Sequence, residues 1–330
     1  MRRQWYCLSI VVLIVGVLFF AKCAQADDSC SPDWMKQNLT ILRGLTLNNV
    51  VLLGSHDAAS CDIHVDSPPV TGYLTHHDKH ITRYARAKDV ESGVCQSASI
   101  AAQLDYGVRY FDMRIAYQNG DYWGCHMWLS TPLLGAGGVF TQFLDFVKSH
   151  PGELIILNLN ELYSDTAPMT DLETSNFYNL VNEKFGNLLV PRGDFSTTTL
   201  GQIWQTAGRI IVIGNVDDDH TSRQIIWDDC HVDSKWMNVK GANVLCDRLQ
   251  RKVLRGWARG DCSEKLRILQ AMQTAGRKVQ NAVDTNALIV QKLQGDWQKY
   301  PLNIIQVDDS VNSGLMPVII ELNRRKTVIK

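Results

Sequence analysis

The stretch NNVVLLGSHDAAS, residues 48–60, joins an apolar run directly to a histidine and an aspartate. The run Val50–Leu53 is continuously apolar, which is typical of a parallel strand that is buried on both faces. Gly54 ends the run, and His56 and Asp57 follow after a single serine. Because the catalytic groups of parallel barrels lie at the carboxyl ends of strands, this pattern predicts that the strand places His56 at a rim.

Further short, β-branched apolar runs recur along the chain and alternate with helical patterns. About eight strands that alternate with helices in roughly 280 residues predict an α/β fold, a (β/α)₈ TIM-type barrel, regular or distorted. We expect a single domain, because no internal repeat or low-complexity linker divides the chain. One run, Leu266–Ala271, is ambiguous, since it could also begin a long helix. The expected strands are Val50–Leu53, Tyr110–Ile115, Tyr122–His126, Leu154–Leu159, Ile210–Ile213, Trp236–Val239, Leu266–Ala271 and Asn303–Val307.

The helical patterns between these runs carry recognisable ends. The stretch at 99–107 has apolar residues at helical spacing, and Gly107 is placed as its stop. A second helix is expected to end at His150 before Pro151, and a third, Thr285–Tyr300, before Pro301.

The first residues have the features of a secretory signal peptide. Two arginines precede an apolar stretch from about Leu8 to Ala21, and residues 24–26 have the small-residue pattern of a cleavage site. The stretch is short for a membrane span of about 20 residues, although a retained signal anchor stays open as the alternative. We therefore expect a signal peptide at 1–26, an N-terminal extension at 27–47, a barrel at 48–330, and a secreted protein.

Charge and cysteine content narrow the functional classes. The chain has 33 Lys and Arg against 34 Asp and Glu, so no basic surface indicates nucleic-acid binding. An exported chain is expected to form disulfides, and the pairs that we favour are Cys61–Cys95 and Cys230–Cys246. No cysteine spacing suggests zinc, and nothing indicates a cofactor or an obligate protein partner. Residues 38–40, Asn-Leu-Thr, form a glycosylation sequon if the host is eukaryotic.

Ionisable or polar groups lie on, or directly follow, five of the expected strands. Two histidines and an arginine at one mouth suit acid–base catalysis at phosphorus, because imidazoles titrate near neutrality and a guanidinium binds phosphate oxygens. A carboxylate, Asp57 or Asp308, would orient the base. The structural alternative is that His56 caps a turn, Arg114 pairs with an aspartate, and His126 is a core histidine. The groups are His56 and Asp57, Asp112 and Arg114, His126, Asn160 and Glu161, and Asp308 and Asp309.

Several motifs together resemble the X-domain of phosphatidylinositol-specific phospholipases C, and most of all the single-domain X-domain-containing proteins of animals. The resemblance covers roughly residues 48–325 and implies that Leu266–Ala271 is a strand. The motifs are LLGSHDA at 52–58, SIAAQLDYGVRYFDMRIA at 99–116, GCHMW at 124–128 and FLDFVKSHPGELIILNLNEL at 143–162.

The resemblance implies a catalytic role for three of these residues. His56 matches the general base that takes the proton from the inositol 2-hydroxyl, and Asp308 matches the aspartate that orients this base. His126 matches the general acid that protonates the leaving oxygen. The implied reaction releases diacylglycerol and leaves a cyclic inositol phosphate, so the implied partner is a phosphoinositide headgroup at a membrane surface.

The resemblance also bears on whether a metal is required and on which headgroup is bound. The metal-dependent enzymes carry calcium-binding acidic residues at the positions of Asp112 and Arg114, whereas Asp57 with Arg114 is the bacterial pattern. We therefore expect no metal. Asn160 stands where the family has lysine or glutamate, which leaves the headgroup open. We expect Asp112, Asn160 and Trp128 to contact substrate.

Two alternatives remain open. One is a phosphodiesterase for another headgroup, such as a glycerophosphodiester, a sphingolipid or a GPI-type glycan. The other is a catalytically idle binding protein on the same barrel, because fold does not fix function.

Overall fold

The computed structural model describes residues 30–77, 84–216, 222–274 and 276–328. The predicted signal peptide, residues 1–26, lies outside the described residues. Within the described ranges, no helix combines the length and the apolar character that a membrane crossing requires.

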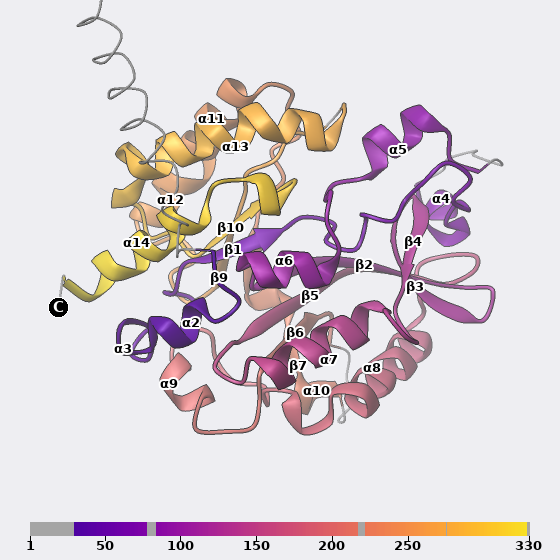
Figure 1. Ribbon diagram of the computed structural model, residues 1–330, viewed down its shortest axis with the longest axis horizontal. Coiled ribbons are helices and arrows are strands. Elements are labelled where there is room, and N and C mark those ends of the chain that lie inside the picture. The colour runs from indigo at the N-terminus through magenta and orange to yellow at the C-terminus, as the bar shows by residue number, and fades with distance from the viewer. Residues whose placement is uncertain (1–29, 78–83, 217–221, 275, 329–330) are drawn as a thin grey trace, which may run out of the picture.

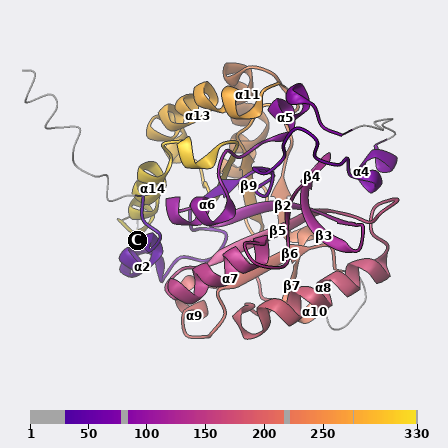
Figure 2. The same cartoon turned by 45° about the vertical axis from the view of Figure 1, so that its right-hand side comes forward.

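Eight parallel strands form a nearly closed barrel in the order β7-β6-β5-β2-β1-β10-β9-β8 (Figures 1 and 2). Among the described residues no pairing joins β7 to β8, so the barrel has one open seam. The predicted (β/α)₈-type barrel is confirmed in this nearly closed form. The strands are β1 Leu52–Ser55, β2 Tyr110–Gln118, β5 Ile155–Tyr163, β6 Ile210–Gly214, β7 Ile226–Asp228, β8 Val232–Ser234, β9 Leu266–Gln270 and β10 Ile304–Val307.

Helices surround the barrel, with α11, α13 and α14 on the side of β9 and β10, and α7 and α8 on the side of β5 and β6 (Figure 1). Short 3₁₀ turns lie at Gly186–Leu188, Asp229–His231, Asp296–Lys299 and Ser310–Asn312, and a π-helical turn at Gln250–Leu254. The helices are α2 Trp34–Gln37, α3 Leu39–Leu42, α4 Thr71–His76, α5 Ala87–Gly93, α6 Ile100–Tyr106, α7 Val139–Ser149, α8 Asp171–Phe185, α9 Leu200–Ile203, α10 Ser222–Ile225, α11 Ala242–Leu249, α12 Arg255–Ala258, α13 Lys278–Gln294 and α14 Met316–Val328.

Most of the predicted helix ends are confirmed. In α6 the Ser99 hydroxyl accepts a hydrogen bond from the backbone N–H of Ala102, and Gly107 ends the helix with a φ of 120°. That conformation favours glycine. Helix α7 ends before His150, as predicted. The last predicted helix ends before Pro301 but begins earlier than expected, at Lys278, and a 3₁₀ turn forms its final residues.

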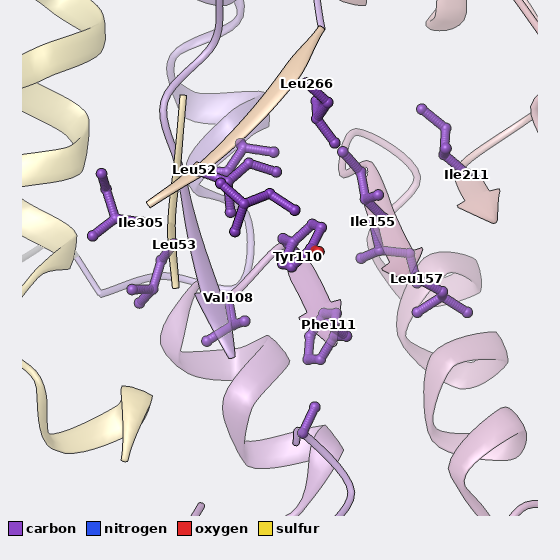
Figure 3. Packing of buried hydrophobic residues seen from close by; sticks show 14 of the residues in the cluster. Leu52, Leu53, Val108, Tyr110, Phe111, Ile155, Leu157, Ile211, Leu266 and Ile305 are labelled. Carbon is purple, nitrogen blue, oxygen red and sulfur yellow. The ribbon is translucent and has the colours of Figure 1, made fainter. Parts of the chain in front are cut away.

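The barrel interior and the space beneath the helices form one continuous apolar core (Figure 3). Leu52 and Leu53 are both fully buried although they are adjacent, because one faces the barrel interior and the other the helices. Trp34 and Leu42 from the N-terminal helices belong to the same core. The predicted extension is therefore packed against the barrel from residue 34 onward.

A buried ion pair fastens the N-terminal helices to the barrel. The guanidinium of Arg109 lies 2.8 Å from Glu153, and both side chains are fully buried. The same carboxylate accepts hydrogen bonds from the backbone N–H groups of Met35 and Lys36 in α2. Removing Glu153 would therefore leave several buried donors without a partner.

Two of the predicted strands are corrected. Tyr122–His126 is a strand, β3 Asp121–His126, but it pairs antiparallel with β2 and with β4 Trp128–Pro132, so it is a hairpin outside the barrel. Trp236–Val239 is not a strand. The places of these two predicted strands in the barrel are taken by β7 and β8. These have only three residues each and are too short to give an apolar run.

The structure does not contain either predicted disulfide, because Cys61, Cys95, Cys230 and Cys246 are free thiols. Cys95 is fully buried, and its sulfur lies 3.5 Å from a carboxylate oxygen of Asp57. Cys230 is exposed in a turn, whereas Cys246 is buried on α11.

Candidate active site

The carboxyl ends of β1, β2 and β10 bring most of the predicted groups to one mouth. His56 and Asp57 follow β1, Arg114 lies on β2, and Asp308 follows β10. Because β1 pairs in parallel with both β2 and β10, these ends lie side by side. A Cβ atom at Gly54 would lie 3.0 Å from the side chains of Ile304 and Tyr110, so any larger residue there would have to displace them.

His56 lies between two carboxylates. Its Nδ1 is 2.7 Å from Oδ1 of Asp308, and its Nε2 is 3.3 Å from Oδ2 of Asp57. An ionised carboxylate only accepts, so Nδ1 carries the hydrogen and Nε2 is the atom available to take a proton. Burial acts to lower the pKa of His56, but Asp57 and Asp308 outweigh it and raise the pKa above 6.5.

Asp57 contacts the arginine and both histidines of the mouth. Its Oδ1 lies 2.8 Å from Nε of Arg114, while its Oδ2 faces His56 and lies 3.6 Å from Nε2 of His126. Burial acts to raise the pKa of Asp57, but the charges of Arg114 and the two histidines hold it well below its usual range. Asp57 therefore stays ionised, and it has a left-handed backbone with a φ of 41°.

Arg114 has a second carboxylate partner, Glu161, which the sequence places at a strand end but does not pair with this arginine. Its Nη1 lies 3.4 Å from Oε2 of Glu161, which also accepts a hydrogen bond of 2.5 Å from the hydroxyl of Tyr163. The register between β2 and β5 shifts after Met113, so Arg114 pairs with Glu161 and not with Asn160. The strong carboxylate neighbours raise the pKa of Arg114 despite the opposing effect of burial.

His126 reaches the mouth from the β3–β4 hairpin. Its Nδ1 donates a hydrogen bond of 2.8 Å to the carbonyl of Gly93, which leaves Nε2 facing Asp57. Burial lowers the pKa of His126, and Arg114 and His56 add to this, although Asp57 opposes it. The two imidazoles thus have pKa values displaced in opposite directions, with ring centroids 6.5 Å apart.

The three predicted substrate-binding residues lie in different surroundings. Asp112 is buried in the mouth, where its Oδ2 accepts a hydrogen bond of 2.7 Å from Gln306, and burial together with Asp57 raises its pKa to about 6. Asn160 is exposed and lines the cleft. Trp128 is only 2% exposed, packs with Ile63 and Ala85 and is not among the residues that line the cleft, so its contact with substrate stays a prediction that the structure does not support.

The mouth opens into a cleft of about 760 Å³. A smaller cavity of about 280 Å³ continues beneath it and shares Asp112, Asn160, Ser234 and Gln270 with its lining. The sequence prediction missed Trp236, which lies in the loop after β8. Its ring stacks on His56 at 5.7 Å between centroids and 26° between planes. No motif marks this residue, because a loop after a three-residue strand has no periodicity.

The residues at the mouth do not fit a calcium ion. Calcium prefers six to eight oxygen ligands, and carboxylates supply most of its charge compensation. Here the guanidinium of Arg114 lies against Asp57 and Glu161 and already supplies a positive charge at that place. A divalent cation beside it would be repelled.

Fold and site together define a class: a parallel barrel whose carboxyl-end mouth is equipped for acid–base chemistry on an anion. Among known proteins, the mouse PI-PLC X domain-containing protein 2 is 24% identical over 319 residues, which cover 90% of this chain and 89% of that protein. A variant-surface-glycoprotein phospholipase C of Trypanosoma cruzi is 28% identical over a stretch that covers 67% of this chain and 60% of the length of that protein.

Among solved structures, the phosphatidylinositol-specific phospholipase C of Listeria monocytogenes superposes with a TM-score of 0.58 at 18% identity, covering 89% of this chain and 98% of that one. No family model matches the chain. The similarity to these relatives and the shared barrel support the phosphatidylinositol-specific phospholipase C X-domain family as the one that this chain resembles.

Proposed function

We propose that this protein is a metal-independent phosphodiesterase that cleaves a phosphoinositide-type diester by attack of a neighbouring hydroxyl. The observation that carries the proposal is the convergence of His56, His126 and Arg114 on one buried carboxylate, Asp57. This arrangement places a base, an acid and a fixed positive charge around one point.

His56 acts as the general base in this proposal. Its Nε2 takes the proton of the headgroup hydroxyl, whose oxygen then attacks phosphorus. The charge that forms on the imidazole is stabilised by Asp308 at 2.7 Å and by Asp57 at 3.3 Å. The raised pKa of His56 reflects the same stabilisation.

His126 acts as the general acid, and its Nε2 gives a proton to the leaving oxygen of the lipid. In the free protein its pKa is lowered, so it holds little charge at neutral pH. A bound phosphodiester anion favours the protonated imidazole, because an opposite charge within about 4–6 Å raises the pKa of a histidine. Substrate binding therefore favours the protonated form of His126, which can act as the acid.

Arg114 takes the place of a metal in the proposed reaction. A guanidinium offers a planar fork to the non-bridging phosphate oxygens and stays charged throughout. Nε of the guanidinium lies 2.8 Å from Asp57, and Nη1 lies 3.4 Å from Glu161. These contacts fix the position of the guanidinium before the substrate binds. Charge that develops on phosphorus is then neutralised without reorganisation.

The proposed substrate headgroup is not restricted to free phosphatidylinositol. Asn160 supplies a neutral amide to the cleft, and the second cavity leaves about 280 Å³ beyond Asp112 and Asn160. This space favours a glycosylated headgroup as the second candidate substrate. The expected signal peptide supports secretion, which would place the enzyme at an external membrane surface.

The test is a ³¹P NMR assay of residues 27–330 with phosphatidylinositol micelles, in EDTA and in calcium. The proposal expects a cyclic phosphodiester product that appears at the same rate in both. Turnover that requires calcium would overturn the role of Arg114. No turnover on phosphatidylinositol, but turnover on a GPI-type glycolipid, would favour the glycosylated headgroup.

A further inference from the structure

Lys278 lies at the cleft without a carboxylate partner. It is the first residue of α13, it lines the cleft, and its side chain is 5% exposed. Its Nζ donates hydrogen bonds of 3.0 and 2.7 Å to the backbone carbonyls of Gln273 and Thr274. In the part of the chain that the structure describes, no ion pair involves this ammonium.

This position is unfavourable for the stability of the fold. The N-terminus of a helix carries a partial positive charge, which opposes a cation in its first turn. Burial of an ammonium adds a desolvation penalty that two neutral carbonyls offset only in part. Places where a residue breaks such local rules are commonly functional sites.

The charge balance of the cleft indicates what Lys278 does there. Arg114 is the other lysine or arginine in the described lining, and its charge is already matched by Asp57 and Glu161. Asp112 adds a further acidic group nearby. An anionic phosphodiester entering this mouth therefore needs more positive charge than Arg114 supplies.

Lys278 approaches the reacting groups from the opposite side to Arg114. In the barrel order β2-β1-β10-β9, Arg114 lies on β2 and Lys278 follows β9, with His56 after β1 between them. Its Nζ is 5.9 Å from the ring centroid of Trp236, which stacks on His56. An ion pair of 3.1 Å between Arg277 and Glu91 joins the start of α13 to α5.

The same end of α5, two residues beyond Glu91, leads to the proposed acid. Its last residue, Gly93, accepts the hydrogen bond that orients His126. The positive charge of Lys278 also acts on the neighbouring thiol of Cys95, although burial and two aspartates dominate and raise the pKa of that thiol. Lys278 is therefore linked to His56 through Trp236 and to His126 through Cys95, whose sulfur lies 3.6 Å from Nδ1 of His126.

We propose that Lys278 is a second phosphate-binding residue, which donates its third N–H to one non-bridging oxygen of the phosphodiester while Arg114 binds the other. An ammonium has three hydrogens, and the two carbonyls use two of them and fix the direction of the third. The identity of the ligand as a phosphodiester rests on the proposed function, whereas the anion site itself does not.

The test measures binding of inorganic phosphate by ³¹P line broadening, in parallel with turnover. Lys278→Met is expected to lower phosphate affinity by about 10- to 100-fold, the effect of losing one charged hydrogen bond. It should raise KM more than it lowers kcat. Lys278→Arg should retain most of the affinity. Arg277→Gln is the matched control, since it removes an adjacent cation that pairs with Glu91 outside the cleft lining.

The outcomes separate this inference from the proposed function. Phosphate affinity in Lys278→Met within twofold of wild type would overturn it, as would wild-type protein that does not bind phosphate. Loss of phosphate binding in Lys278→Met, with no phosphoinositide turnover by wild type, would support the anion site and reject the proposed reaction. Lys278→Gln, whose amide can still donate to the two carbonyls, replaces the methionine variant if that variant does not fold.

Discussion

The carboxylate of Asp308 sets the basicity of the proposed base, and Asp308→Asn removes its charge with little change of shape. In the structure Oδ1 of Asp308 is 2.7 Å from Nδ1 of His56, and both side chains are almost fully buried. The amide of an asparagine can donate to Nδ1, which would move the ring hydrogen to Nε2. The variant therefore weakens the base and also favours the wrong tautomer.

The expected loss follows from the strength of this contact. A hydrogen bond to a charged group contributes about 1.5–3 kcal/mol. If it forms fully only when His56 becomes an imidazolium in the transition state, its loss lowers kcat by about 10- to 150-fold, because 1.36 kcal/mol corresponds to a factor of ten. Asp57 remains at 3.3 Å and limits the loss.

The same variant shifts the pH profile in a defined direction. The reaction needs one proton on the histidine pair, which gives a bell-shaped profile, and the alkaline limb reports loss of that last proton. That proton belongs mainly to His56, because its pKa is raised while that of His126 is lowered. Removing Asp308 lowers the pKa of His56, so the alkaline limb moves to lower pH.

The assay is kcat and kcat/KM against pH for wild type, Asp308→Asn and Asp309→Asn. Asp309 is the matched control, because its carboxylate is bonded to Ser97 and Asn312 and not to a histidine. Its left-handed backbone, with a φ of 49°, also accepts asparagine well. An Asp308→Asn enzyme with wild-type kcat and an unmoved alkaline limb would refute the role of His56 as the base.

Three further expectations follow from the same structure. His126→Ala should lower kcat by about 10²–10⁴-fold, the usual effect of removing a positioned acid, and an unchanged rate on phosphatidylinositol would remove it from the mechanism. Arg114→Lys should lower kcat at least about tenfold, because an ammonium lacks the planar fork, and added calcium should not restore it; near-wild-type activity would make Arg114 structural. Glu153→Ala should lower the free energy of unfolding in urea by about 3–5 kcal/mol, since it leaves the guanidinium of Arg109 buried without its partner. Glu183→Ala, which removes an exposed ion pair, should change it by no more than about 1 kcal/mol, and equal effects would contradict the structural role of the buried pair.

The parts of this fold that the sequence predicts are those with a strong local signal. The run at Leu52–Leu53 and the run in β10 are buried on both faces, so their apolar character is continuous and easily recognised. Their pairing explains why Asp308 could be expected beside His56 although 252 residues separate them. By contrast, β7 and β8 have three residues each, and a pattern of three cannot define a period.

The pairing of Glu161 and the site residues Trp236 and Lys278 were not predicted, for a different reason. Glu161 reaches Arg114 because the register between β2 and β5 shifts by one residue, and strand alternation alone would select Asn160. Trp236 lies in the loop after β8, and Lys278 is the first residue of α13. Tertiary packing brings both residues to the cleft, and no local pattern in the sequence encodes it. Trp128 is predicted to contact substrate because it is close to His126 in sequence, but in the structure it packs in a cluster with Ile63 and Ala85.

In the proposed mechanism, the position of Asp57 lets an arginine take the place of a metal. Here one carboxylate holds Arg114 through Oδ1 and faces both histidines through Oδ2, so the fixed charge and the mobile proton share a partner. When a phosphate binds to Arg114, Oδ2 of Asp57 still faces both histidines and stabilises the one that is protonated. The left-handed backbone of Asp57 at the end of β1 is the structural condition for this sharing, since it turns a single side chain towards β2 and the hairpin at once.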